Sequence, residues 1–224
     1  MPPKPKFTRE DYINCAYEIA RTDGMDAVVA REVGRRLGTS STPVFSVFGS
    51  MEGLKREVRA KAMEEFCALA YRALEYSPAF KQFGLFMINF AKDEPELFRL
   101  LFMDGGKCGR DFSSMIPELG ECAEVILGTI ERDYSLSRSQ AETMFSHMWI
   151  FTYGICVFCV NGIYDFTDDK LADILGRQFI AMMMLLRSGG DGLKTPHPEK
   201  GMGNTSGLDE VIGAFVVPGK ENDK

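Results

Sequence analysis

The chain has 224 residues, which is enough for one large domain or two modest ones with a real hydrophobic core. Its net charge of −6 at pH 7 excludes a protein that binds nucleic acid over its whole surface. The charge is uneven: residues 1–60 carry ten Lys and Arg against eight Asp and Glu, a net charge of +2, so the remaining residues carry −8. This distribution suits a protein in which only the N-terminal part meets phosphate.

Two helices are predicted before residue 38. The first begins at Thr8, whose hydroxyl has a cap-like spacing to Asp11, and it ends at Asp23-Gly24. The second spans residues 28–37, where Val29, Val33 and Leu37 share one face and three arginines point away from it. Both helices therefore have one face suited to a core.

A turn of small residues then leads into a third helix. Gly38 can take the positive φ that ends a helix, and Ser40 is predicted to cap the next one. Ser41 and Thr42 open that helix. Its inward face is predicted to consist of Val44, Phe45 and Phe48.

Two short helices joined by such a turn are typical of a helix-turn-helix. In that motif the start of the second helix reaches base edges in the major groove, while the first helix crosses the backbone. Short hydroxylated side chains would let the second helix sit deep in the groove. The alternative is an ordinary helical hairpin within a helical domain.

A long connector helix is predicted over residues 51–75, with Ser50 as its cap. Its start is basic, with Lys55, Arg56 and Arg59, and its end is apolar. We therefore expect Lys55, Arg56 and Arg59 to reach a phosphate backbone and the far half of the helix to join a hydrophobic core.

Residues 7–54, FTREDYINCAYEIARTDGMDAVVAREVGRRLGTSSTPVFSVFGSMEGL, resemble the DNA-binding domain of the tetracycline-repressor (TetR) family of bacterial regulators. Besides the helix lengths, the positions in register are Ala16, Gly24, the R-E-V-G of residues 31–34, Gly38, Ser40, Val44-Phe45 and Phe48. The resemblance implies an all-α fold, with an N-terminal three-helix helix-turn-helix domain and a C-terminal helical domain that binds a small ligand and dimerises.

The residues expected to bind DNA are Arg31, Thr39, Ser40, Ser41, Thr42, Val44, Phe45 and Lys55. The family usually has a tyrosine at the position of Phe45 and a lysine at that of Met51, and both are typical phosphate contacts. Arg31 and Lys55 are the expected replacements. Because the set holds no Arg or Asn placed for a bidentate base contact, sequence preference is expected to rest partly on DNA shape.

The rest of the chain also predicts helices. Ser77-Pro78 has the pattern of a cap and a first-turn proline, opening a helix that Pro95 ends. Pro95 opens a further helix that stops at Asp104-Gly105, and another is predicted from about residue 116 to 132. These helices are expected to build the core of the C-terminal domain.

Two long helices come last. Ser137 with Gln140 forms a capping box for a helix to about residue 160, and Thr167 caps a helix to about residue 187. The family resemblance implies a homodimer formed through the helices around 138–160 and 168–187. Residues 188–224 are rich in Gly and Pro and are predicted to be a flexible tail.

The stretch from Thr143 to Tyr164 has 22 residues without Asp, Glu, Lys or Arg, a length that would cross a bilayer. Its flanking residues Glu142 and Asp165 are acidic rather than basic, and polar residues interrupt it. A helix buried on both sides is equally apolar. We therefore expect a core helix and no membrane partner.

Six cysteines, at positions 15, 67, 108, 122, 156 and 159, are scattered along the chain, and no signal peptide is recognised. Reduced thiols in a cytoplasmic protein are expected. Cys156 and Cys159 form a C-x-x-C inside an apolar helix, whereas a redox motif would open a helix after a strand. Core thiols are favoured, and a thiol-based redox sensor is the alternative.

Aromatic and methionine side chains are abundant between residues 86 and 153 and suit a pocket for a small, largely apolar effector. The candidate ligand-binding residues are Phe86, Met103, Phe112, Met115, Phe145, Met148, Trp149 and Tyr153. The simpler alternative places each of them in the hydrophobic core. No nucleotide loop, metal-spaced cluster or nucleophile with a base is recognised, so neither enzyme activity nor a metal or cofactor is expected.

The sequence thus predicts three parts: a helix-turn-helix DNA-binding domain over 1–50, a ligand-binding and dimerisation domain over 51–187, and the tail over 188–224. The expected function is that of a ligand-responsive transcriptional repressor that binds a palindromic DNA operator as a homodimer. The alternatives are a redox sensor and a helical protein-interaction module whose DNA-binding domain has lost its function.

Overall fold

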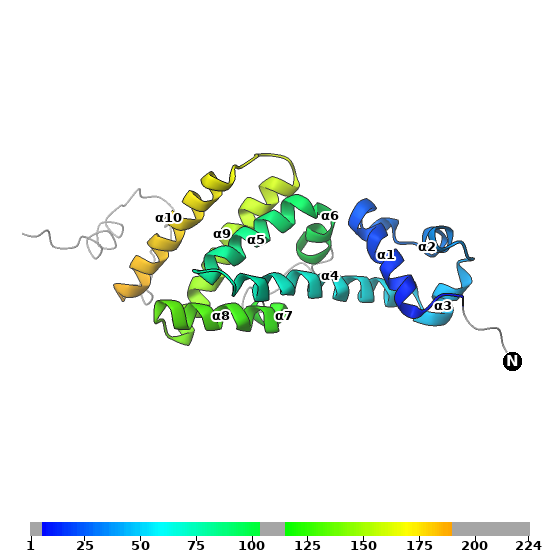
Figure 1. The fold of residues 1–224 in the computed structure, drawn as a ribbon, viewed down its shortest axis with the longest axis horizontal. Coiled ribbons are helices and arrows are strands. Elements are labelled where there is room, and N and C mark those ends of the chain that lie inside the picture. Colours follow the sequence, from blue (N-terminus) through cyan, green and yellow to red (C-terminus); the bar gives the residue numbers. More distant parts are fainter. Residues whose placement is uncertain (1–5, 104–114, 190–224) are drawn as a thin grey trace, which may run out of the picture. The chain divides into compact units, whose positions relative to one another are not determined.

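The computed structural model describes residues 6–103 and 115–189, and this part of the chain contains helices and loops but no strand (Figure 1). The expected all-α class is confirmed for these residues. The chain divides into two compact units, Met1–Leu175 and Gly176–Lys224. Phe112, Cys108, the predicted helix stop at Asp104-Gly105 and the tail from residue 190 lie outside the described residues.

Three helices form the N-terminal part of the first unit, which we call the head (residues 6–50): α1 (Arg9–Asp23), α2 (Ala30–Leu37) and α3 (Thr42–Phe48). They gather around the start of the long helix α4 (Met51–Ala73) (Figure 1). A short 3₁₀ turn, η1 (Met25–Ala27), links α1 to α2. The side chains that no solvent reaches in this region are Ala16, Ile19, Val28, Val33, Val44 and Leu54.

The predicted caps of α1 and α4 are present. Thr8 and Asp11 form a reciprocal capping box, and the Ser50 hydroxyl accepts a hydrogen bond from the Gly53 amide at 3.1 Å. The start of α2 differs from the prediction because the helix begins at Ala30, which leaves Val29 47% exposed. Val28, one residue earlier, takes the buried place instead.

The remaining helices of the first unit form the body (residues 79–103 and 115–175). It begins with α5 (Ala79–Asp93), α6 (Pro95–Phe98) and η2 (Arg99–Met103), a π-helical continuation of α6. Ser77-Pro78 is a cis peptide, and Pro78 lies at the N-cap rather than inside the first turn. The prediction that this proline opens the helix from within is therefore wrong by one residue.

The next helices of the body are α7 (Met115–Leu119) and α8 (Glu121–Tyr134), where the sequence predicted one continuous helix. Gly120 divides them because it adopts a φ of 57°, which a helix cannot contain. The capping box of Ser137 and Gln140 opens α9 (Arg138–Val160), as predicted. Lys170 donates its amide to the Thr167 hydroxyl at 3.4 Å at the start of α10 (Asp168–Arg187).

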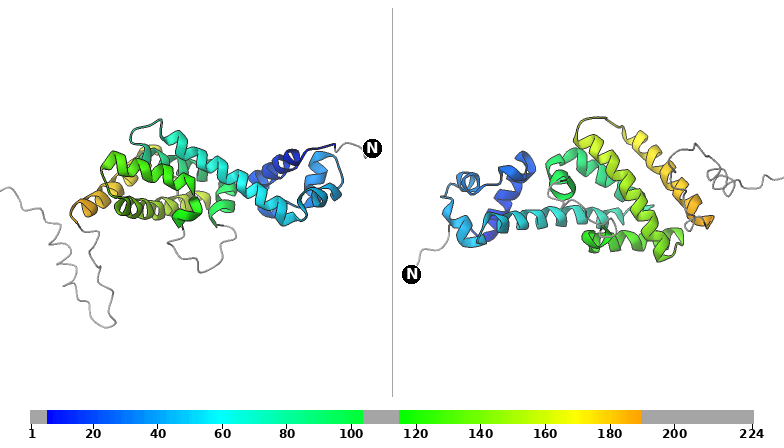
Figure 2. Two further views of the ribbon diagram at one scale, coloured as in Figure 1. Left: turned by 90° about the horizontal axis from the view of Figure 1, so that it is seen from below. Right: turned by 180° about the vertical axis from the view of Figure 1, so that it is seen from behind.

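The core of the body lies between α4, α5, α8 and α9, with α5 and α9 packed side by side (Figure 2). Phe66 of α4 has no exposed surface and lies at its centre. Its ring centroid is 4.9 Å from that of Phe102, 5.5 Å from Phe90, 6.0 Å from Phe83 and 6.2 Å from Trp149, all edge to face. One aromatic cluster therefore joins α4 to α5, η2 and α9.

Helix α9 is the one helix among residues 6–103 and 115–189 that is long and apolar enough to cross a membrane. Length and composition alone are weak evidence for a membrane span. Within the structure α9 packs against α5 and α8.

Candidate nucleic-acid interface

The turn between α2 and α3 is closed by backbone hydrogen bonds. Gly38 adopts the left-handed conformation, with a φ of 65° and a ψ of 42°. The Thr39 amide donates to the Gly34 carbonyl at 2.9 Å, and the Gly38 amide donates to the Arg35 carbonyl at 3.3 Å. This pair of bonds is a Schellman motif, which ends α2 and sends the chain sharply into α3.

Gly34 permits the turn to lie directly against α2. A Cβ atom at this position would meet the Thr39 carbonyl oxygen at 2.9 Å and both carbonyl atoms of Ser40 at 3.0 Å. Because the obstacles are backbone atoms, a side chain at position 34 could be accommodated only if the turn moved. The angle between α2 and α3 therefore depends on this glycine.

The predicted DNA-binding residues fall into three groups. Arg31, Ser40, Thr42 and Phe45 are exposed, whereas Thr39, Ser41 and Lys55 are half-buried. Val44 has no exposed surface. Its expected contact with DNA is therefore excluded for this conformation, because its side chain belongs to the core.

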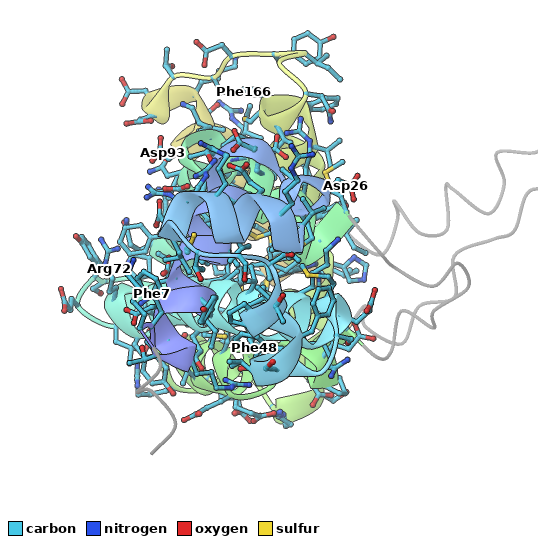
Figure 3. All side chains as sticks on the ribbon, turned by 90° about the vertical axis from the view of Figure 1, so that its right-hand side faces the viewer. Phe7, Asp26, Phe48, Arg72, Asp93 and Phe166 are labelled. Carbon is cyan, nitrogen blue, oxygen red and sulfur yellow. The ribbon has the colours of Figure 1, made fainter. Side chains whose placement is uncertain are left out.

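The predicted inward face of α3 is only partly correct. Val44 is buried and Phe48 is half-buried, but Phe45 is 48% exposed. Phe48, which is labelled in Figure 3, packs edge to face on Tyr12 with ring centroids 6.4 Å apart. The guanidinium of Arg9 lies over the Phe48 ring. In a helix of only seven residues, the sequence pattern does not determine well which residues face the core. Phe45 lies on the outer face with Thr42.

The hydroxyl groups at the start of α3 are not used for capping. Ser41, and not Ser40, occupies the N-cap position, and its side chain makes no capping hydrogen bond. Within residues 6–103 and 115–189 the side chains of Ser40, Ser41 and Thr42 have no hydrogen-bond partner. They are therefore available to a ligand.

The arginines of α2 differ in whether they form ion pairs. Glu32 accepts hydrogen bonds from Arg35 at 2.6 Å and 2.8 Å and from Arg36 at 2.9 Å, and Arg36 also pairs with Asp23 at 2.5 Å. The two guanidinium groups lower the pKa of Glu32 to about 2. Arg31 forms no ion pair with any described residue.

Two further cations follow α3 in the sequence, at the start of α4. Lys55 and the exposed Arg56, on the first turns of α4, also form no ion pair with the part of the chain that the structure describes. Arg59, the third cation expected to reach phosphate, instead donates its guanidinium to backbone carbonyls of η2. Ser46 and Val47, which are exposed on α3, were not among the predicted contacts. Ser46 follows Thr42 by four residues and so lies on the same helix face, and this spacing is the sequence feature that could have indicated Ser46.

The head is tied to the body by an ion pair as well as by α4. The Arg21 Nε of α1 donates to a carboxylate oxygen of Glu94 at 2.7 Å, and its Nη2 donates to the other oxygen at 2.5 Å. A two-pronged pair of this kind fixes orientation as well as distance. Glu94 lies directly between α5 and α6.

The candidate ligand-binding residues do not form one group. Phe145, Met148 and Trp149 are buried in α9, with the rings of Phe145 and Trp149 stacked 5.7 Å apart. Tyr153 is half-buried and donates its hydroxyl to the Phe102 carbonyl at 3.3 Å. The rings of Phe145, Trp149 and Tyr153 belong to the aromatic cluster of the body that contains Phe66 and Phe102.

The other candidate ligand-binding residues are not part of the aromatic cluster. Phe86 packs on Tyr76 at 5.7 Å and beneath the guanidinium of Arg72, away from the ring contacts of Trp149. Met103 is 38% exposed, and Met115 is half-buried. Two described cavities, of about 320 Å³ between α1 and α4 and about 260 Å³ beside Cys159, are lined by none of the candidate ligand-binding residues.

The C-x-x-C cysteines have the surroundings of core thiols. Cys156 has no exposed surface and donates its thiol to the Met87 carbonyl at 3.7 Å. Burial raises the pKa of Cys156 and that of Cys159. Both shifts favour the unreactive thiol over the thiolate.

No family model matches the chain, and no curated protein matches it. Among the described residues no group of three or more His, Cys, Asp and Glu side chains is arranged to hold a metal ion.

Proposed function

We propose that the chain is a DNA-binding transcriptional regulator of the tetracycline-repressor (TetR) type. In this proposal α2, the Gly38 turn and α3 are a helix-turn-helix, and the outer face of α3 lies in the major groove. The observation that most strongly supports this proposal is the tight turn between α2 and α3, where the absence of a side chain at Gly34 lets the backbone of the turn lie against α2. In addition, the hydroxyls of Ser40, Ser41 and Thr42 have no hydrogen-bond partner among the described residues.

The charges around this turn support the same proposal. Arg31, Lys55 and Arg56 lie on either side of α3 in the sequence, and none of them forms an ion pair with a described carboxylate. Cations of this kind bind phosphates on both flanks of a groove and position the reading helix. Phe45 and Val47 supply apolar surface for thymine methyl groups.

The body is proposed to bind a small, largely apolar effector, and the chain is proposed to dimerise through α9 and α10. Ile150 and Phe158 of α9 are 54% and 39% exposed. In the second unit, Ile180 and Met184 of α10 are 59% and 54% exposed. Large apolar side chains exposed along a helix are suited to burial by a second copy of the chain. The site of action is proposed to be the cytoplasm, where the operator is.

Regulation then follows from differential binding. An effector that binds the body better when the two heads are apart would weaken DNA binding by that difference in affinity. The contacts available to transmit the change are α4 and the Arg21–Glu94 ion pair. The protein would accordingly act as a repressor that its ligand releases.

The test is selection of bound fragments by the full-length protein from random duplex DNA. We expect enrichment of an inverted repeat with half-sites about one helical turn apart, roughly 34–36 Å. A mass in solution of twice the chain mass would accompany it. Failure to bind any duplex in low salt would favour the alternative of a helical protein-interaction module.

A further inference from the structure

Helix α3 and its two flanking turns carry no side chain that can make a two-pronged hydrogen bond to a base. Residues 37–51 contain no Asp, Glu, Lys, Arg, His, Asn or Gln. In the major groove, two-pronged contacts come from Arg or Lys for guanine and from Asn or Gln for adenine. Direct recognition of a base by this face therefore depends on some other property of the groove.

The polar groups on the outer face of α3 are the hydroxyls of Thr42 and Ser46, and both residues are exposed. A hydroxyl group both donates and accepts hydrogen bonds. It can donate to the O4 atom of thymine and can equally accept from the N4 amino group of cytosine. These two hydroxyls therefore tolerate either pyrimidine and do not select between them.

The same face exposes two large apolar side chains, Phe45 at 48% and Val47 at 39%. No described ring packs on Phe45. At 3.6 residues per turn, the exposed residues follow one another around the helix in the order Phe45, Thr42, Ser46 and Val47. The outer face is therefore apolar at both edges, with the hydroxyls between them.

The charges next to α3 favour duplex DNA, rather than a second protein, as the occupant of this face. Arg31, Lys55 and Arg56 form no ion pair with a described carboxylate. The phosphates of a duplex lie on both sides of the major groove and would bind such cations while the outer face of α3 meets the base edges. This step rests on the function proposed above.

We propose that α3 recognises a pyrimidine by its C5 methyl group, with Phe45 and Val47 as the residues that determine specificity. In the major groove this methyl group is the apolar feature of thymine. 5-Methylcytosine carries the same group at the same ring position, whereas uracil and unmodified cytosine lack it. Thymine and 5-methylcytosine are therefore accepted at the contacted position, and methylation of a cosine-free site is not required. Methylation of cytosine at that position would strengthen binding.

The test uses the full-length protein and a duplex that it selects from random DNA. Each thymine of a half-site is replaced in turn by uracil, by cytosine and by 5-methylcytosine, with guanine opposite the two cytosines. Fluorescence anisotropy measures the affinities. At one or more positions we expect thymine and 5-methylcytosine to bind alike, and uracil and cytosine to bind about fourfold more weakly, because burial of one methyl group is worth about 0.8 kcal/mol.

Two controls accompany this comparison. The same replacements in the DNA outside the half-sites should leave affinity unchanged. Phe45→Ala or Val47→Ala should abolish the difference between thymine and uracil at the position that the residue contacts, and both side chains are exposed, so the fold should be kept. Arg31→Ala should weaken binding to all versions of the duplex equally, because a phosphate contact carries no information about the base.

The pattern of affinities decides the proposal. If uracil binds like thymine and 5-methylcytosine binds like cytosine at every position, recognition is by hydrogen bonds or DNA shape; the inference is then overturned, while the proposed function stands. A methyl effect that persists in both alanine variants would also overturn it, since other residues would then read the methyl group. Failure to bind any duplex in low salt would overturn the proposed function and this inference together.

Discussion

The head and the body are held together by different kinds of contact. In the head, single positions meet geometric demands: Gly34 lies against the backbone of the turn, and Gly38 takes a positive φ. In the body, the rings around Phe66 fill space, and no single ring is required by backbone geometry. A surface that must present side chains in a fixed direction is built on backbone constraints, whereas a core that needs only volume is built on interchangeable apolar side chains.

The largest effect on stability is expected from a change in the core of the body. Phe66→Ala should destabilise the protein by about 3–5 kcal/mol, because it removes the ring on which four aromatic neighbours pack. Urea unfolding followed by circular dichroism measures the change. Phe45→Ala is the matched control, since that ring is 48% exposed, and its cost should be within about 0.5 kcal/mol. Equal costs for the two variants would mean that the aromatic cluster is not the core.

The second largest effect on stability is expected from a change at the turn in the head. Gly34→Ala should cost about 1–3 kcal/mol, because the new Cβ would overlap the Thr39 and Ser40 backbone. Gly128→Ala is the control: a Cβ in that exposed position of α8 meets no atom within 4 Å, and the substitution should stabilise by about 0.4–1 kcal/mol. Thermal unfolding of both variants tests the contrast, and a neutral Gly34→Ala would show that the turn is free to move.

A third change leaves stability alone and tests the charges of the head. Arg31→Ala should reduce the slope of log affinity against log salt by about one unit, the effect of one lost phosphate contact. Fluorescence anisotropy with a duplex obtained by selection measures it. Arg132→Ala, on α8 and paired with Asp133 at 2.8 Å, should leave the slope unchanged. The same loss of slope in both variants would point to overall charge rather than to an interface.

The smallest expected effect concerns pH. The pKa of Glu32 lies below its ordinary value because Arg35 and Arg36 bind the carboxylate, so its stabilising contribution is present above about pH 4.5. That contribution is lost as the pH falls toward about 2. Glu32→Gln should therefore melt below the natural protein at neutral pH and approach it in acid. A constant difference in Tm across this range would show that the carboxylate charge is not involved.

Local features of the fold were predictable from the sequence. The caps at Thr8, Ser50, Ser137 and Thr167 depend on a side chain and an amide a few residues apart, so they can be recognised without knowledge of the packing. Features set by tertiary packing were not. The division at Gly120 was missed because a glycine alone does not state which φ it adopts.

The same distinction applies to the candidate site. The turn residues Gly38 and Ser40 were recognised, but the short helix α3 left its phase undetermined. Val44 is buried as predicted, whereas Phe45, also predicted to face inward, is exposed. In the body, aromatic composition alone could not separate Phe86 from the cluster around Trp149.

The central claim is that the start of α3 lies on duplex DNA, and Thr42→Glu tests it most directly. An acidic residue in the first turn of a helix is favourable to the fold, so the variant should keep its Tm, yet its charge would face the phosphates. We predict a loss of affinity of at least about tenfold for the selected duplex in low salt. Unchanged affinity in a folded Thr42→Glu protein would contradict the account.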